Sequence, residues 1–167
     1  MRVYVPATVA MLRELVDKRE LHAVGGTAFA LTPALREAYA SGDDEELAEV
    51  AMAEAARASL RLLADDIHSS ATPMFRRAVI AVDATGVTLR PDLDDAVVKL
   101  DGPIEYKRIG SVHMDLAEAE SAVAKAVDII DAADLGDEDA EFVLGDAEDH
   151  QLAWYATQEL PFLLELL

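Results

Sequence analysis

The sequence predicts an α+β fold, a single domain with a mainly antiparallel central sheet and helices packed on it. Two observations support this prediction. Residues 76–114 hold short apolar or alternating runs separated by Gly, Pro and Asp, which is typical of strands joined by tight turns. On both sides of this region, apolar residues recur three and four positions apart, as in amphipathic helices. The β–α–β order of residues 2–31 and 104–156 also allows a ferredoxin-like arrangement with extra helices.

A strand that leads through a threonine into a helix occurs three times. In the C-terminal copy, residues 151–156 alternate as a half-buried strand does, and four leucines follow at helical spacing. The threonine between strand and helix can accept a hydrogen bond from the first helical turn, so each one is predicted to be an N-cap. The three units are Arg2–Val16 around Thr8, Thr27–Tyr39 around Thr32, and Gln151–Leu167 around Thr157.

A long helix is predicted from Asp44 to about Ala64. Asp43 and Glu46 have the spacing of a capping box at its start. Its abundant alanines allow close approach of a neighbouring element, and Arg57 lies one turn before Arg61. The stripe expected to face the core is Leu47, Ala51, Ala55, Ala58 and Leu62.

The middle of the chain is predicted to form an antiparallel meander. Asp83-Ala84-Thr85-Gly86 resembles a hairpin turn, and Asp101-Gly102-Pro103 is a second turn. Gly110 lies inside the last strand, which indicates a bulge or bend. The four strands expected are Ala78–Val82, Val87–Arg90, Ala96–Leu100 and Ile104–Met114.

Beyond the meander, Asp115 and Glu118 have capping-box spacing for a helix over residues 116–132. Glu141–Leu144 is interpreted as a strand that pairs with Gln151–Ala156, the alternative being a helix that starts near residue 146 and runs through Trp154. Core packing is the default expectation for Trp154. The chain thus divides into residues 1–66, 76–114 and 115–167. The core face of the helix over residues 116–132 is expected to be Leu116, Ala119, Val123, Val127 and Ile130.

Charge is the strongest global feature. The chain has 14 Lys and Arg but 33 Asp and Glu, which gives a net charge of −19. Such a chain repels phosphates, so neither nucleic acid nor an anionic membrane surface is expected as a partner. The acidity is explained by solubility, or by an acidic face for a basic partner protein. No apolar run reaches membrane-span length, the N-terminus lacks signal-peptide features, and cysteine is absent. These features favour a cytoplasmic location, and no cofactor is expected.

The three threonine-capped helix starts are a candidate ligand site. If their strands lay parallel in one sheet, the free N–H groups after Thr8, Thr32 and Thr157 would share one edge and could bind an anion. No Gly-rich phosphate loop accompanies them. Good capping alone explains the pattern and is the favoured explanation.

Histidines and aromatic residues supply the other site candidates. His113 and Asp115 could leave the same face of a strand and, with His150, make a weak metal site or an acid–base pair. Asp115 is also explained as an N-cap. Tyr155 could line a ligand pocket or a dimer interface, and Arg36 could contact a ligand beside it. The acidic run 135–141 fails the EF-hand template, and no serine-nucleophile motif occurs.

Five segments spread over nearly the whole chain, with residues 76–114 the weakest part, resemble a family of small acidic actinobacterial proteins of unknown function. The resemblance implies a bacterial, cytoplasmic protein, and it assigns no activity, cofactor or catalytic residue. The acidic surface and the lack of any catalytic motif lead us to predict a non-enzymatic protein–protein interaction or regulatory module, with a basic partner or as a homodimer. The alternative is a small-molecule binder or enzyme with an anion site at the helix N-termini. The segments are MRVYVPAT, TAFALTPALREAY, EAARASLRLL, AADLGDEDAEF and LAWYATQELP.

Overall fold

The computed structural model describes all residues, Met1–Leu167. The strands are β1 (Arg2–Ala7), β2 (Glu20–Leu21), β3 (Thr27–Phe29), β4 (Ala78–Asp83), β5 (Val87–Leu89), β6 (Val97–Leu100), β7 (Ile104–Glu105), β8 (Ile109–Met114) and β9 (Ala153–Tyr155). The α-helices are α1 (Val9–Lys18), α2 (Pro33–Ala38), α3 (Asp44–His68), α4 (Glu120–Asp134), α5 (Glu138–Glu148) and α6 (Leu160–Glu165). Short 3₁₀ turns are η1 (Val24–Gly26), η2 (Tyr106–Arg108), η3 (Ala117–Ala119) and η4 (Thr157–Glu159).

Seven strands form one sheet in the order β5-β6-β3-β1-β4-β8-β9, and all neighbours in it are antiparallel. Strands β2 and β7 pair separately. The predicted α+β fold with an antiparallel sheet is confirmed. A ferredoxin-like arrangement is not formed, because β1 and β3, which flank α1, are antiparallel neighbours and not the parallel strands of a βαβ unit. None of the helices has the length and apolar composition needed to cross a bilayer.

The predicted meander is wrong. Asp83–Gly86 does not close a hairpin, because β4 and β5 are separated by three other strands in the sheet. The physical reason lies in burial: β4 is apolar and buried along nearly all its length, which suits a central strand, whereas β5 is mostly exposed and forms an edge. Gly110 does lie at a bulge, since the β4–β8 register shifts between Ala81 and Val82 and leaves the glycine unpaired.

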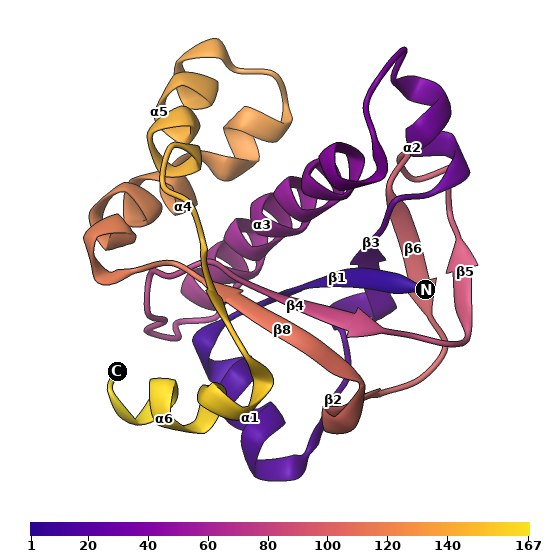
Figure 1. Ribbon diagram of the computed structural model, residues 1–167. Coiled ribbons are helices and arrows are strands. Elements are labelled where there is room, and N and C mark those ends of the chain that lie inside the picture. The colour runs from indigo at the N-terminus through magenta and orange to yellow at the C-terminus, as the bar shows by residue number, and fades with distance from the viewer.

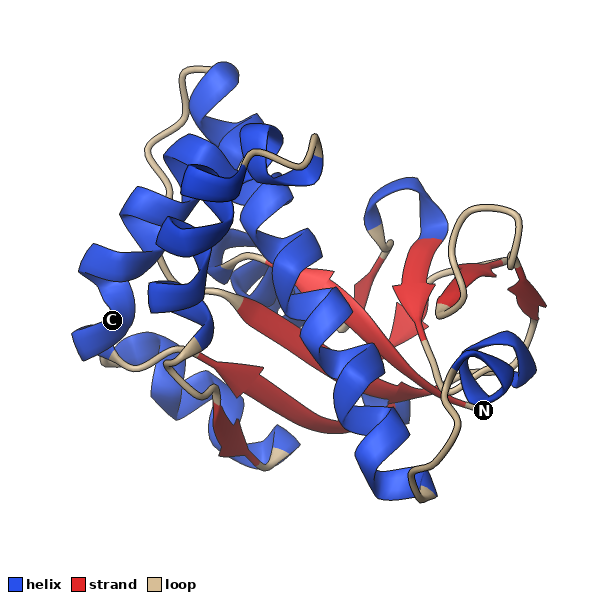
Figure 2. Ribbon diagram, turned by 90° about the horizontal axis from the view of Figure 1, so that it is seen from above, coloured by secondary structure: helices blue, strands red, loops and turns tan.

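Helices cover both faces of the sheet, and the long helix α3 lies across one of them (Figure 2). Helices α1 and α6 lie together under the opposite face (Figure 1), where Leu12, Leu15, Leu160 and Leu164 join the main core. Beyond the sheet, the second half of α3 packs with α4 and α5 around an apolar cluster separate from the main core. The sheet residues of the main core alternate along their strands and include Val3, Val5, Ile80, Val82, Val112 and Met114.

Helix α3 has two different partners along its length, which widens its buried surface. Its first half packs on the sheet through Ala51 and Ala55, and its second half packs on α4 and α5 through Leu60 and Leu63. The predicted stripe is therefore correct at its start, but Ala58 and Leu62 are only half-buried. The buried residues of α3 are Leu47, Ala51, Ala55, Ala56, Ser59, Leu60, Leu63 and Ala64.

The caps predicted at the first two threonines and at Asp43 are confirmed. The hydroxyl oxygens of Thr8 and Thr32 accept from the N–H groups of Met11 and Leu35 at 3.2 and 3.1 Å. Asp43 forms the capping box with Glu46. Local side-chain chemistry thus starts three helices as expected.

Two other predicted caps are wrong, because tertiary partners take the side chains. Asp115 binds the buried Arg77 and caps no helix. Thr157 donates its hydroxyl to the carbonyl oxygen of Ile109 at 3.0 Å and opens a 3₁₀ turn. The 3₁₀ turn η3 precedes α4, so Leu116 lies before the helix. It is exposed and does not belong to the core face expected for this helix. Ala119, Val123, Val127 and Ile130 are buried as expected.

Residues 141–144 are helical, so the hairpin predicted there is wrong. Asp137 caps α5, with its carboxylate accepting from the N–H of Ala140 at 2.9 Å, and three acidic residues in the first turn suit the positive end of the helix. A helix through Trp154 is not formed either, because β9 pairs with β8. Strand β9 is an edge strand and Trp154 is 60% exposed on it, so the expectation of a core tryptophan is wrong.

Candidate functional site

The three threonines do not assemble a common anion site. That hypothesis required parallel strands. Because β1 runs antiparallel to β3, Thr8 and Thr32 follow strand ends that lie on opposite sides of the sheet's length. Thr157 follows β9, which is separated from β3 by three other strands. Each hydroxyl is already hydrogen-bonded within the chain: Thr8 and Thr32 in their caps, Thr157 to Ile109.

His113, His150 and Tyr155 lie in three different surroundings. His113 is on the sheet face that α3 covers in part, with its Nε2 atom 2.9 Å from the Ser111 hydroxyl. Burial, with a smaller contribution from the charge of Arg2, lowers the pKa of His113. Tyr155 is the neighbour of Val112 and packs against the core on the opposite face. His150 follows α5 and lines a cleft described below.

Arg36 and Asp115 are both engaged in ion pairs within the chain. The Arg36 guanidinium pairs with Asp44 at the start of α3 and lies on the surface. Asp115 is enclosed with Arg77, so its carboxylate is not free to bind an ion with His113 or His150. No three His, Asp or Glu side chains are grouped so that they could hold a metal ion.

The feature with the character of a binding site is a cleft of about 460 Å³ between α3, α5 and the segment that leads from α5 to β9. In Figure 1 this segment descends from α5 past α3 toward the sheet. Such a volume lies in the range of small-ligand pockets. Polar residues that line it are Glu49, Glu54, Arg57, Arg77, Glu148, His150 and Gln151, and the larger apolar ones are Met52, Leu60, Leu144 and Leu152.

Arg77 enters this cleft from the start of β4, although the residue is only 4% exposed. Its Nε and Nη2 atoms donate to the two carboxylate oxygens of Asp115 at 2.9 and 2.8 Å. Nη2 also donates to the carbonyl oxygen of His150 at 2.7 Å. These bonds fix the plane of the guanidinium.

The remaining nitrogen of Arg77, Nη1, makes no hydrogen bond within the chain. Every side-chain nitrogen and oxygen that is closed off from solvent has a partner, so Nη1 is in contact with solvent. Arg77 lines the cleft, and Nη1 is the one side-chain nitrogen with which it can still donate a hydrogen bond. An arginine nitrogen can only donate, so this position calls for an acceptor.

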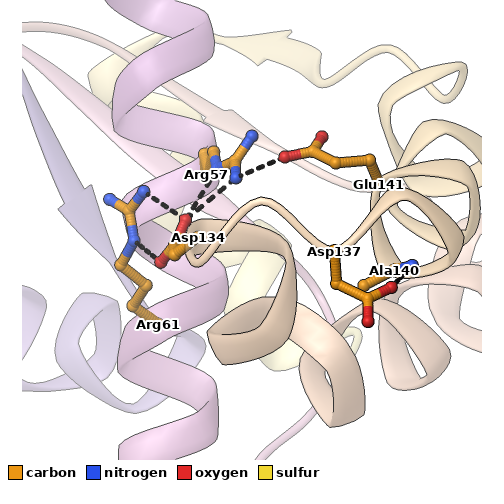
Figure 3. A network of polar contacts seen from close by, with 6 residues as sticks. All are labelled: Arg57, Arg61, Asp134, Asp137, Ala140 and Glu141. Carbon is orange, nitrogen blue, oxygen red and sulfur yellow. Dashed lines mark hydrogen bonds and ion pairs between the residues drawn. The ribbon is translucent and has the colours of Figure 1, made fainter.

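Arg57 in the wall of the cleft is held by a network that ties α3 to α4 and α5 (Figure 3). It donates to Asp134 at 3.0 and 2.9 Å and to Glu141 at 3.1 Å. Arg61, one turn later, binds the same Asp134 at 2.7 and 3.0 Å. Hydrogen bonds from Arg61 first, and then from Arg57, lower the pKa of Asp134.

Three carboxylates in the cleft have no ion-pair partner in the chain. Glu49 and Glu54 come from α3, and Glu148 is the last residue of α5, whose final turn carries no basic residue. Burial is the main cause that raises the pKa of Glu54. The two arginines are already compensated by Asp134, Glu141 and Asp115, so the cleft presents an excess of negative charge.

A second hollow of about 330 Å³ lies between the Asp83–Gly86 connection and residues 100–105. It is formed largely by exposed loop residues, and no buried donor opens into it. The α3–α5 cleft is therefore the better candidate.

The sequence reasoning missed both Arg77 and the cleft. Arg76-Arg77 directly before an apolar run is a weak signal, since basic residues commonly flank strands. The role of Arg77 becomes clear only from the pairing of β4 with β8, because this pairing places Arg77 next to Asp115. Of the site residues expected from the sequence, only His150 lines the cleft.

Comparison with known proteins agrees with a family that has no assigned activity. A family model described as "Family of unknown function (DUF6912)" matches residues 1–164. No curated protein and no solved structure matches the chain. The match covers the whole sheet, the cleft and the α-helices as far as α6. The chain therefore belongs to the family of unknown function DUF6912.

Proposed function

We propose that this protein is a non-enzymatic binding module that holds a basic segment of a partner protein in the cleft between α3 and α5. The observation that supports the proposal is the set of three carboxylates, Glu49, Glu54 and Glu148, which line the cleft without an ion-pair partner. The setting that follows from the resemblance, a cytoplasmic actinobacterial protein, belongs to the proposal as well.

Charge favours a cationic ligand at this place. The net charge of −19 attracts basic partners over a distance, and a cleft lined by one sign of charge strengthens the local field. The C-terminal end of α5 adds the negative end of a helix dipole close to Glu148. A bound cation would also stabilise the ionised form of Glu54, whose pKa burial raises.

The apolar walls suit the stems of basic side chains. Met52 and Leu60 of α3 face the same cleft as Leu144 of α5 and Leu152. Lysine and arginine have long methylene stems that pack on apolar surface while their charged ends reach polar groups. A basic peptide side chain therefore matches the cleft in both shape and charge.

Binding of a fluorescein-labelled oligolysine peptide, followed by fluorescence polarisation at physiological salt, tests the proposal. We expect Glu49→Gln/Glu54→Gln/Glu148→Gln to weaken binding at least tenfold. The matched control Asp17→Asn/Glu20→Gln/Glu165→Gln changes three exposed acids on α1, β2 and α6, and thus makes the same change in net charge. The control should weaken binding less than twofold. Equal loss in both variants would show that only the overall charge attracts the peptide and would refute the proposal.

A further inference from the structure

Because the buried Arg77 lines the cleft, a well-matched ligand must supply a hydrogen-bond acceptor as well as a positive charge. We infer that the cleft recognises a lysine or arginine residue within a peptide chain, with the side-chain cation at the carboxylates and a main-chain carbonyl oxygen at Nη1 of Arg77. This inference rests on the proposed function and specifies its ligand.

The donor is fixed before any ligand arrives. Besides the side-chain bonds to Asp115 and His150, the backbone N–H of Arg77 donates to the Asp115 carboxylate at 2.8 Å. The two side chains are 5% and 0% exposed, so the guanidinium has little freedom to turn away. A donor held in one orientation costs a ligand little ordering, which favours binding.

The acceptor that fits this donor is a neutral oxygen. Asp115 already compensates the charge of Arg77, and Glu49, Glu54 and Glu148 add negative charge to the same cleft. A carboxylate on the ligand would be repelled by these groups, whereas an amide carbonyl accepts the hydrogen bond without that repulsion. A residue inside a peptide carries such a carbonyl, and a free amino acid carries a carboxylate.

Binding of small probes to the unchanged protein, followed by NMR chemical-shift titration, separates these chemistries. Nα-acetyl-arginine amide has the guanidinium cation and neutral carbonyls, n-butylguanidine has the cation alone, and Nα-acetyl-arginine has a carboxylate in place of the C-terminal amide. We expect the capped residue to bind at least fivefold more tightly than either of the others. Because only the ligand changes, the comparison does not depend on how a variant folds.

The variant Glu49→Gln/Glu54→Gln/Glu148→Gln provides the control for the cation. It should weaken the binding of the capped residue and of n-butylguanidine by a similar factor, because both ligands lose the same contact. A variant effect confined to one of them would overturn the assignment of the cation to these carboxylates.

The outcomes distinguish this inference from the proposed function. Equal affinity for the capped residue and n-butylguanidine would overturn the role of Nη1 while cation binding stands. Tighter binding of Nα-acetyl-arginine than of its amide would overturn the preference for a neutral acceptor and indicate a small-molecule site. Failure of all three probes and of oligolysine would overturn both the inference and the proposed function.

Discussion

Arg77 and Asp115 form a buried ion pair that joins the residue before β4 to the residue after β8, with 2.8 Å between Nη2 and Oδ1. Three donors of Arg77, one from the backbone and two from the side chain, converge on this one carboxylate. The pair therefore links the neighbouring strands β4 and β8 at one end and at the same time fixes the orientation of an arginine that lines the cleft.

Removing one partner of this pair should be costly. Asp115→Ala leaves a buried guanidinium without its counter-charge, so we expect the free energy of unfolding in urea to fall by about 3–5 kcal/mol. Glu14→Ala, which removes the exposed pair with Lys18, is the control and should cost about 0.5 kcal/mol. The double variant Arg77→Met/Asp115→Leu should recover most of the loss, because no charge then stays buried. A double variant as unstable as Asp115→Ala would contradict this account.

Ser59 connects α3 to two strands, and its replacement should leave backbone groups unpaired. Its hydroxyl donates to the carbonyl oxygen of Ala7 at 2.7 Å and accepts from the N–H of Ala78 at 3.1 Å. Since Ser59 is fully buried, we expect Ser59→Ala to lower the free energy of unfolding by about 1–3 kcal/mol. Ser121→Ala, at an exposed helical position, should change it by about 0.5 kcal/mol or less. Equal effects of the two substitutions in urea unfolding would argue against the bridging role.

Asp134 should make stability depend on acid pH. Its pKa in the folded state is held below the ordinary value of 3.8, chiefly by the hydrogen bond from Arg61. The stabilisation is thus present above pH 3.8 and is lost as the pH falls through the lower folded value. We expect Asp134→Asn to be less stable by about 1 kcal/mol at pH 7. The difference from the unsubstituted protein should shrink in thermal unfolding below pH 3.8, and a constant difference at all pH values would be inconsistent with the network.

Glu54 should have the opposite pH dependence. Burial raises its pKa above the ordinary value of 4.5, so its contribution to stability is fully present below pH 4.5 and is lost as the pH rises through the folded value. Glu54→Gln should therefore raise the melting temperature at pH 7 and have little effect below pH 4.5. The gain should stay under about 1 kcal/mol because the side chain is only half-buried. A loss of stability at pH 7 would show that the carboxylate has a stabilising partner.

Trp154 should report on the surface of the protein. Because the indole is 60% exposed on the edge strand β9, its fluorescence emission should resemble that of a tryptophan in water and be quenched readily by acrylamide. Trp154→Phe should change the free energy of unfolding by about 0.5 kcal/mol or less. A blue-shifted emission protected from acrylamide would mean that another surface covers this residue in solution, and light scattering would then show whether it is a second copy.

Features governed by neighbours a few residues apart could be predicted from the sequence. Thr8, Thr32 and Asp43 cap their helices because a side chain and an N–H group three residues later are always close at a helix start. Gly110 marks a bulge because a glycine weakens a strand locally. These signals need no knowledge of the rest of the chain.

Features governed by distant partners could not be predicted in this way. Asp115 has the local spacing of a cap, but a buried arginine 38 residues earlier in the chain binds it more strongly. The connection Asp83–Gly86 resembles a hairpin turn, but the burial of β4 on both faces places three strands between it and β5. The candidate site was missed for the same reason, since Arg77 and Glu148 come together only through the packing of α3 with α5.

The position of α6 has a consequence for folding. Leu160 and Leu164 join the same apolar cluster as Leu12 and Leu15, although the two pairs are far apart in the sequence. Until α6 has docked, part of this apolar surface is open to water and to other chains. A folding intermediate without docked α6 is therefore the species most exposed to aggregation through this face.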